Sequence, residues 1–341
     1  MTSLRCVGNT SSELDSANAR YKTLKRLMTS GSLESYATQQ FQILSERQQV
    51  RLQQSQQRSQ PFSQCIAQHA MNDERNRYID IIPFDSNRVV LSTLGPAGDD
   101  YINASWIEWQ SRRYIATQGP LPSTCGDFWR MVLEQQVNVI VCLTPEMENR
   151  RVKCAAYWPV GNDTKRYRLK SRKHINHFLF PSSHGDDDWT IEVKNSQQEE
   201  HHSEAACIVR QVQVSCYKQQ QLLQTSTVYQ LQFLGWADHS VPQQTSHLNA
   251  LVRLANQLQQ TSPMVVHCSA GCGRTGTFCV VDTVTGWLKH SESKEDEWVD
   301  PVFEVTDAFR QQRTTMVQTA SQYLFCYHAI WDYLQQQQLE V

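Results

Sequence analysis

The stretch Val265–Phe278, which reads VVHCSAGCGRTGTF, decides the fold of this chain. A short apolar run precedes a cysteine, a loop with two glycines follows, and apolar residues then recur every three or four positions up to Leu288. This order predicts a buried strand, a tight loop and an amphipathic helix. The backbone N–H groups of residues 269–274 are expected to point into one concavity, together with the positive end of the helix macrodipole. Such a loop would hold a tetrahedral dianion.

Cys268 is the first residue of that loop. Donors that bind a dianion also stabilise a thiolate, so we expect the pKa of Cys268 to lie below its ordinary value and the sulfur to be ionised at neutral pH. Arg274 offers a planar fork that can bind two equatorial oxygens of a phosphoryl group. We expect Thr275 to place its hydroxyl near the sulfur, and His267 to orient the loop through backbone contacts instead of acting as a base.

Composition places this segment in a globular protein. The chain has 341 residues, 40% of them hydrophobic, which is enough for a substantial core. Thirty-two Lys and Arg against 34 Asp and Glu give a formal charge of -2, so no global field attracts nucleic acid or an anionic membrane. No apolar run reaches the roughly 18 residues that span a bilayer. The eleven dispersed cysteines contain no Cys-x2-Cys pair and are expected to be free thiols in a reducing compartment.

The chain divides into four stretches. Residues 1–32 are rich in Ser, Thr and Asn and are expected to be flexible. Residues 33–60 hold a predicted surface helix and a Gln-rich tract, and residues 335–341 are a polar tail with a second Gln cluster. Between them, residues 61–334 alternate β-branched runs with longer amphipathic segments, which is typical of a mixed α/β domain.

Two buried strands are predicted at the centre of one sheet, at Val137–Leu143 and Met264–His267. The adjacent His201 and His202 have no spaced third ligand, so no metal site is expected. The Walker signature and the Gly-rich dinucleotide fingerprint are both absent, and no cofactor is expected.

The motif HCSAGCGRTG, His267 to Gly276, resembles the signature loop of the classical, tyrosine-specific, non-receptor type protein tyrosine phosphatases. A buried cysteine in a strand-to-helix turn does not explain the two glycines and Arg274 together. The resemblance implies an α/β fold, with a strongly twisted mixed β-sheet flanked by helices and an N-terminal helical extension, and makes residues 61–334 the catalytic domain. It also implies a phosphate-binding loop that begins at the nucleophile Cys268 and continues through Ser269, Ala270, Gly271, Cys272 and Gly273.

Further motifs of that family precede the loop. Asn76–Arg88, NRYIDIIPFDSNR, looks like the phosphotyrosine-recognition loop. The resemblance implies that Tyr78 stacks on the substrate ring and that Asp80 accepts backbone N–H bonds from the bound peptide. The motif KCAAYWP, which begins at Lys153, also matches, and Glu148 falls where the family has a glutamate that orders the active-site loops. The segments DYINASWI, from Asp100, and YIATQGP, from Tyr114, match two structural signatures.

Two more motifs imply the remaining catalytic groups. WADHSVP, Trp236 to Pro242, looks like the loop that closes over substrate, with Asp238 as the general acid. QTASQY, Gln318 to Tyr323, resembles the segment in which Gln322 aims the hydrolytic water and Gln318 assists.

This chain departs from the family pattern in its closing loop and in one cysteine. Ala237 stands where the family most often has Pro, and Ser240 where it usually has Gly, so we expect slower or less complete closure without loss of chemistry. Cys272 is expected to pack in the loop. The alternative is that oxidised Cys268 forms a protective disulfide with Cys272 or with Cys154.

The sequence therefore predicts a metal-free phosphatase that hydrolyses phosphotyrosine in proteins through a cysteinyl-phosphate intermediate. We expect a cytoplasmic monomer, with access to the nucleus left open, that does not insert into membranes. Its partners would be phosphotyrosine-containing proteins, kinases being one option. Two alternatives stay open: a dual-specificity or phosphoinositide phosphatase with the same cysteine and arginine, and a phosphotyrosine-binding protein without turnover.

Overall fold

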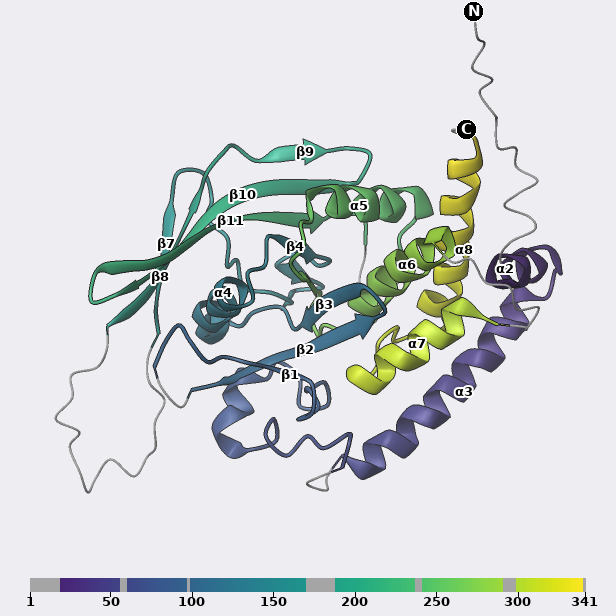
Figure 1. Ribbon diagram of the computed structural model, residues 1–341, viewed down its shortest axis with the longest axis horizontal. Helices are drawn as coiled ribbons and strands as arrows, with labels where there is room; N and C mark the ends of the chain where they lie inside the picture. The colour runs from purple at the N-terminus through teal and green to yellow at the C-terminus, as the bar shows by residue number, and fades with distance from the viewer. Residues whose placement is uncertain are drawn as a thin grey trace, which may run out of the picture.

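The computed structural model describes residues 19–55, 60–96, 99–169, 188–236, 241–290 and 299–339 (Figure 1). Its centre is one large mixed β-sheet. In sheet order the strands are β1 (Arg88–Val90), β2 (Tyr101–Trp109), β3 (Arg112–Thr117), β12 (Met264–His267), β4 (Val139–Cys142), β11 (Gln221–Phe233), β10 (Cys207–Lys218), β8 (Trp189–Asn195) and β7 (Thr164–Leu169), with β9 (Glu200–His202) paired to β10. A separate hairpin consists of β5 (Met147–Glu148) and β6 (Arg151–Val152).

Strand β12 lies in the middle of this sheet, between β3 and β4 and parallel to both. All of its residues are buried. This confirms the prediction of two central strands in one sheet, and β12 has the predicted bounds. The second strand, β4, is shorter than the predicted 137–143, because it begins at Val139 and ends at Cys142. The N–H of Leu143, just beyond it, still donates to the carbonyl of His267 (2.8 Å).

Helices cover both faces of the sheet (Figure 1). Side chains of β4 alternate between two cores: Val139 and Val141 belong to one, and Ile140 and Cys142 to the other. The second core is closed by α4 (Cys125–Glu134). The first is closed by α5 (Thr245–Leu258), α6 (Gly273–His290), α7 (Pro301–Gln312) and α8 (Ala320–Leu339). Two short 3-10 helices are η1 (Ala70–Arg75) and η2 (Pro122–Thr124).

The N-terminal helices belong to the same core. Helix α2 (Ala19–Thr29) lies within the stretch expected to be flexible, so that expectation was wrong for these residues. Its apolar residues recur every three positions, and Tyr21, Leu24 and Leu27 are buried, with Tyr21 stacked on Trp331 of α8 at 6.3 Å. Residues 1–18 lie outside the described range. Helix α3 (Leu33–Gln54) starts where the sequence predicted and packs on α7 and α8.

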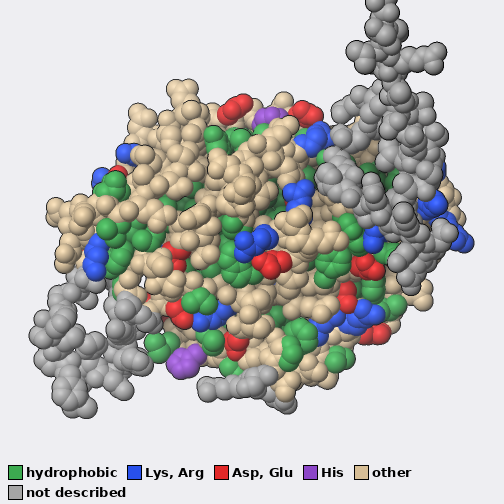
Figure 2. Space-filling model, in the orientation of Figure 1, with side chains coloured by type: hydrophobic (Ala, Val, Ile, Leu, Met, Phe, Trp, Pro, Cys, Tyr) green, Lys and Arg blue, Asp and Glu red, His purple; other side chains and the backbone are tan. Residues whose placement is uncertain are grey.

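The second Gln-rich stretch, residues 335–338, continues helix α8, which ends at Leu339. The predicted polar tail is therefore helical up to that residue. On the face shown in Figure 2, basic and acidic side chains are interspersed, in keeping with the formal charge of -2. Among the helices of the described ranges, none combines the length and apolarity that crossing a membrane requires.

Candidate active site

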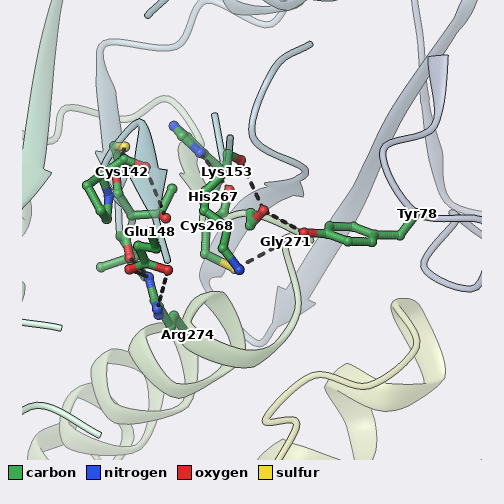
Figure 3. Close-up of polar contacts among 12 residues, drawn as sticks. Tyr78, Cys142, Glu148, Lys153, His267, Cys268, Gly271 and Arg274 are labelled. Carbon is green, nitrogen blue, oxygen red and sulfur yellow. Dashed lines mark hydrogen bonds and ion pairs between the residues drawn. The ribbon is translucent and has the colours of Figure 1, made fainter. Parts of the chain in front are cut away.

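The loop after β12 turns back over its own first residue. Cys268 follows directly after the last residue of β12, and the backbone N–H of Gly271 donates to its sulfur at 3.3 Å (Figure 3). Gly271 has φ +76°, a conformation that L side chains rarely adopt, and a Cβ there would overlap the carbonyl oxygen of Thr117. Helix α6 begins two residues later, at Gly273. The predicted order of strand, loop and helix is therefore present.

A buried arginine that the sequence analysis missed holds the loop from behind. The guanidinium of Arg313 donates to the carbonyl oxygens of Gly271 (2.8 Å) and Ala270 (3.0 Å). Its other donors are bound to the side chains of Asn103 (2.7 Å) and Ser105 (3.1 Å) of β2. Because the carbonyls are held by Arg313, the N–H groups of the loop are left for an anion. Arg313 lies in a loop after α7, and only a family-level comparison of that loop could have identified it.

The surroundings of Cys268 favour its thiolate. Burial alone would raise the pKa of this buried cysteine, but the hydroxyl of Thr275, the guanidinium of Arg274 and the backbone N–H groups of Thr275 and Cys272 lower the pKa below its ordinary value. The Thr275 hydroxyl is fully buried and has no nitrogen or oxygen partner in the described part of the chain, which leaves it for the sulfur. Charge and hydrogen bonds therefore outweigh burial.

Arg274 is held as a fork by the β5–β6 hairpin. Its two terminal nitrogens donate to both carboxylate oxygens of Glu148, at 2.8 and 3.0 Å (Figure 3). One of them also donates to the carbonyl of Leu143 at 3.1 Å. The side chains of Arg274 and Glu148 are 7% and 9% exposed, so solvent screens the pair weakly. The guanidinium is therefore oriented before any anion binds.

The neighbouring segments fix the wall of the loop. The hydroxyl of Ser269 donates to the carbonyl of Lys153 (3.0 Å), and the carbonyl of Ser269 accepts from the N–H of Gly119 (2.9 Å). His267 is fully buried, with its ring nitrogens 2.7 Å from the Tyr157 hydroxyl and 3.2 Å from the carbonyl of Cys268. The imidazole thus contacts the backbone of the loop and not the sulfur.

The segment expected to recognise an aromatic substrate lies beside the same loop. The hydroxyl of Tyr78 is 2.9 Å from that of Ser269, and Figure 3 shows the ring of Tyr78 directed at the loop. Arg77 anchors this segment by donating to the carbonyls of Gly119 (3.0 Å) and Pro120 (2.9 Å). The half-buried ring of Tyr78 forms a wall above the anion site, while Asp80 is exposed.

The two glutamines lie over the start of α6. A Cβ on Gly273 would be 3.0 Å from the side-chain oxygen of each of Gln318 and Gln322. Gln322 is buried, and its side-chain oxygen accepts from the N–H of Gln318 at 3.0 Å, whereas Gln318 itself is exposed. The amide of Gln322 is thereby held next to the loop.

The expected closing loop is described only at its two ends. Trp236 is buried, with its ring 6.4 Å from that of Phe233 and 6.3 Å from that of Phe325. Residues 237–240, which include Ala237, Asp238 and Ser240, lie outside the described residues. The role assigned to Asp238 therefore remains a prediction from the sequence.

Cys272 and Cys154 are buried free thiols. Burial, followed by the nearby Cys268, raises the pKa of Cys272 to about 12. Burial, followed by Cys142, raises that of Cys154. Both are thus protonated at neutral pH, in contrast to Cys268. A disulfide of either with Cys268 stays a prediction.

Comparison with known proteins gives this geometry a family. The sequence model of the family described as protein-tyrosine phosphatase matches residues 72–332. The chain therefore belongs to the protein-tyrosine phosphatase family, and the resemblance inferred from its motifs is confirmed.

Individual relatives agree with that assignment. The chain is 38% identical over 267 residues to tyrosine-protein phosphatase non-receptor type 20 of Homo sapiens, over 77% of this chain and 55% of the relative. To non-receptor type 18 of Homo sapiens it is 37% identical over 264 residues, 76% of this chain and 51% of the relative. To receptor-type tyrosine-protein phosphatase V of Rattus norvegicus it is 40% identical over 271 residues, 77% of this chain and 14% of the relative. The chain spans about half the length of the non-receptor relatives.

Proposed function

We propose that this protein hydrolyses phosphotyrosine in proteins. In the first step the thiolate of Cys268 attacks phosphorus in line, the sulfur–phosphorus bond forms and the bond from phosphorus to the tyrosyl oxygen breaks. Arg274 and the loop amides stabilise the charge on the transferring group. Asp238 protonates the leaving oxygen, so that tyrosine departs as a neutral phenol.

The second step returns the enzyme to its starting state. A water molecule positioned by Gln322 attacks the cysteinyl phosphate, and the carboxylate of Asp238 takes its proton. The sulfur–phosphorus bond breaks, inorganic phosphate leaves and the thiolate of Cys268 is regenerated. No redox step occurs, and the residues named supply every proton transfer.

One observation carries this proposal. The sulfur of Cys268, whose thiolate form is favoured, accepts a hydrogen bond from the backbone N–H of Gly271, and both carboxylate oxygens of Glu148 hold the guanidinium of Arg274 beside it. The ring of Tyr78 supports an aromatic substrate, because a wall above the anion site favours a phosphorylated side chain as long as tyrosine over a shorter one.

The test is a set of parallel assays on para-nitrophenyl phosphate, a phosphotyrosyl peptide, a phosphoseryl peptide and a phosphoinositide. We expect turnover of the first two and its loss in Cys268→Ser. Preferred turnover of the phosphoseryl peptide or the lipid would favour the dual-specificity or phosphoinositide alternative. Tight binding of the phosphotyrosyl peptide without turnover would favour a binding module.

We also propose that the protein acts as a monomer in the cytoplasm, on tyrosine-phosphorylated proteins. A thiolate nucleophile requires a reducing compartment, and the cysteines within the described ranges are free. Asp238→Ala should retain bound substrates from a cell extract, because without protonation of the leaving oxygen their hydrolysis is slowed. Mass spectrometry of the retained proteins would then identify them.

A further inference from the structure

The loop between α7 and α8 has a strained backbone next to the site. Thr315 has φ +62° and Val317 has φ +61°, and both are β-branched residues, for which the left-handed region is a genuine outlier. Residues in this conformation persist only where their surroundings hold them in it. This loop runs from Arg313, which holds the phosphate loop, to Gln318, whose N–H holds the amide of Gln322.

Helix α3 supplies a side chain that holds the first of these strained residues. The side-chain oxygen of Gln48 accepts from the N–H of Thr315 at 2.7 Å, and its amide nitrogen lies 3.3 Å from the Thr315 hydroxyl. A single amide therefore binds both the backbone N–H and the hydroxyl of Thr315. Gln48 itself is half-buried at the contact between α3 and this loop.

Helix α3 also contacts Arg310 of α7, which holds the next two residues of the loop. The buried guanidinium of Arg310 donates to the carbonyls of Met316 (3.0 Å) and Val317 (2.7 Å). The ring of Phe41, from α3, lies over that guanidinium at 4.9 Å. Helix α3 thus contacts the loop through Gln48 and, by way of Arg310, through Phe41.

We propose that Gln48 is a positioning residue for hydrolysis of the cysteinyl phosphate. It holds Thr315 in the left-handed conformation, which fixes the N–H of Gln318 and, through it, the amide of Gln322. The inference rests on the proposed function, because that function assigns Gln322 to the hydrolytic water. Without Gln48, Thr315 relaxes towards negative φ. Because Arg310 still holds the carbonyls of Met316 and Val317, and the N–H of Val317 still donates to the carbonyl of Cys272 (3.3 Å), the change reaches the N–H of Gln318 as a small shift. Arg313 stays in place, since its two terminal nitrogens also donate to the side chains of Asn103 and Ser105.

This arrangement separates the two chemical steps. Attack by Cys268 depends on groups that Gln48 does not touch, so kcat/KM, which reports transfer to the enzyme, is unchanged. Hydrolysis of the intermediate depends on Gln322, so kcat falls, by about tenfold for a misplaced water. When the second step limits turnover, KM falls together with kcat and a burst of released phenol precedes the steady state.

The experiment compares Gln48→Ala with Gln39→Ala, a control at an exposed position of the same helix, using para-nitrophenyl phosphate and stopped-flow detection. Gln48→Ala should lower kcat and KM together and show a burst of about one phenolate per enzyme, whereas Gln39→Ala should match the parent. Thr315→Gly adopts positive φ without help, so Gln48→Ala should have no effect on kcat in a Thr315→Gly background. Denaturant unfolding of each variant confirms that the chain is folded.

Three results would overturn the inference: Gln48→Ala indistinguishable from Gln39→Ala, a fall in kcat/KM as large as the fall in kcat, or an undiminished effect in the Thr315→Gly background. Failure of the proposed function is a different result, since the parent itself would then show no turnover that Cys268→Ser abolishes.

Discussion

At Gly271 the structure gives a reason for glycine that the sequence did not contain. The sequence analysis placed this residue in the phosphate-binding loop that the family resemblance implies. The structure adds that its φ is positive and that a Cβ would overlap the carbonyl of Thr117, a residue of β3. Local sequence predicts that a loop must curl, but not which distant backbone presses on it. Arg313 was missed for the same reason, because its contacts with the loop span more than 40 positions.

Alanine at position 271 tests that reading. Gly271→Ala should lower the free energy of unfolding by more than the roughly 1–2 kcal/mol of a positive φ alone, and should reduce turnover by about tenfold or more. Gly161→Ala is the matched control, because Gly161 has φ +57° with no atom within 4 Å of an added Cβ. Equal losses of stability and activity in the two variants would show that the contact with Thr117 is unimportant.

Glu148 offers a second test at a single side chain. Glu148→Gln leaves the buried Arg274 without its countercharge, and a hydrogen bond to a charged group contributes about 1.5–3 kcal/mol. We expect kcat/KM to fall by about tenfold or more in steady-state assays. Glu146→Gln, at an exposed neighbouring position, should match the parent. An active Glu148→Gln variant would mean that Arg274 needs no preorientation.

Among the elements, the central strands were predicted best. The residues of β12 and β4 form apolar runs that are all buried in the sheet, so the sequence alone is sufficient to predict these two strands. Helix α2 was missed because its three core residues are sparse among polar ones, and only the partner surface on α8 shows why they are buried. The hairpin β5–β6 was not predicted, since strands this short carry no period of their own, and its residue Glu148 was identified only through the family resemblance.

Residues 237–240 of the expected closing loop lie outside the described residues, so its behaviour is predicted from the sequence alone. Proline at position 237 narrows the conformations of the free loop, so ordering the loop becomes easier by about 0.4–1 kcal/mol. Ala237→Pro should therefore raise kcat by up to about fivefold if closure limits turnover. Single-turnover kinetics on a phosphotyrosyl peptide would measure it. An unchanged or lower rate would count against loop ordering as the limitation.

For the molecule as a whole, charge pairs join the N-terminal helices to the catalytic body. Asp307 of α7 accepts from Arg47 at 2.7 Å and from Arg51 at 2.6 Å, both on α3. The side chains of Arg51 and Asp307 are 12% and 11% exposed. Composition predicted a globular chain with a balanced charge. It could not predict that α3 and the phosphatase body share one core, because that depends on contacts about 260 positions apart.

Removal of that shared carboxylate should destabilise the entire molecule. Asp307→Asn leaves Arg51 largely buried without its partner, so the free energy of unfolding should fall by about 1–3 kcal/mol in a single cooperative transition in urea. Glu108→Gln breaks a pair whose side chains are 52% and 55% exposed, and should change stability by less than about 1 kcal/mol. A separate early transition in Asp307→Asn would show that the N-terminal helices unfold independently.

The ionisation of Cys268 is the central claim, and the pH dependence of its alkylation measures it directly. Iodoacetamide reacts with the thiolate, so the inactivation rate should fall only as the pH drops through a pKa below the ordinary cysteine value of about 8.5. Inorganic phosphate should protect the site, and mass mapping should find the label on residue 268. A midpoint at or above the value of free cysteine, with no protection by phosphate, would contradict the account.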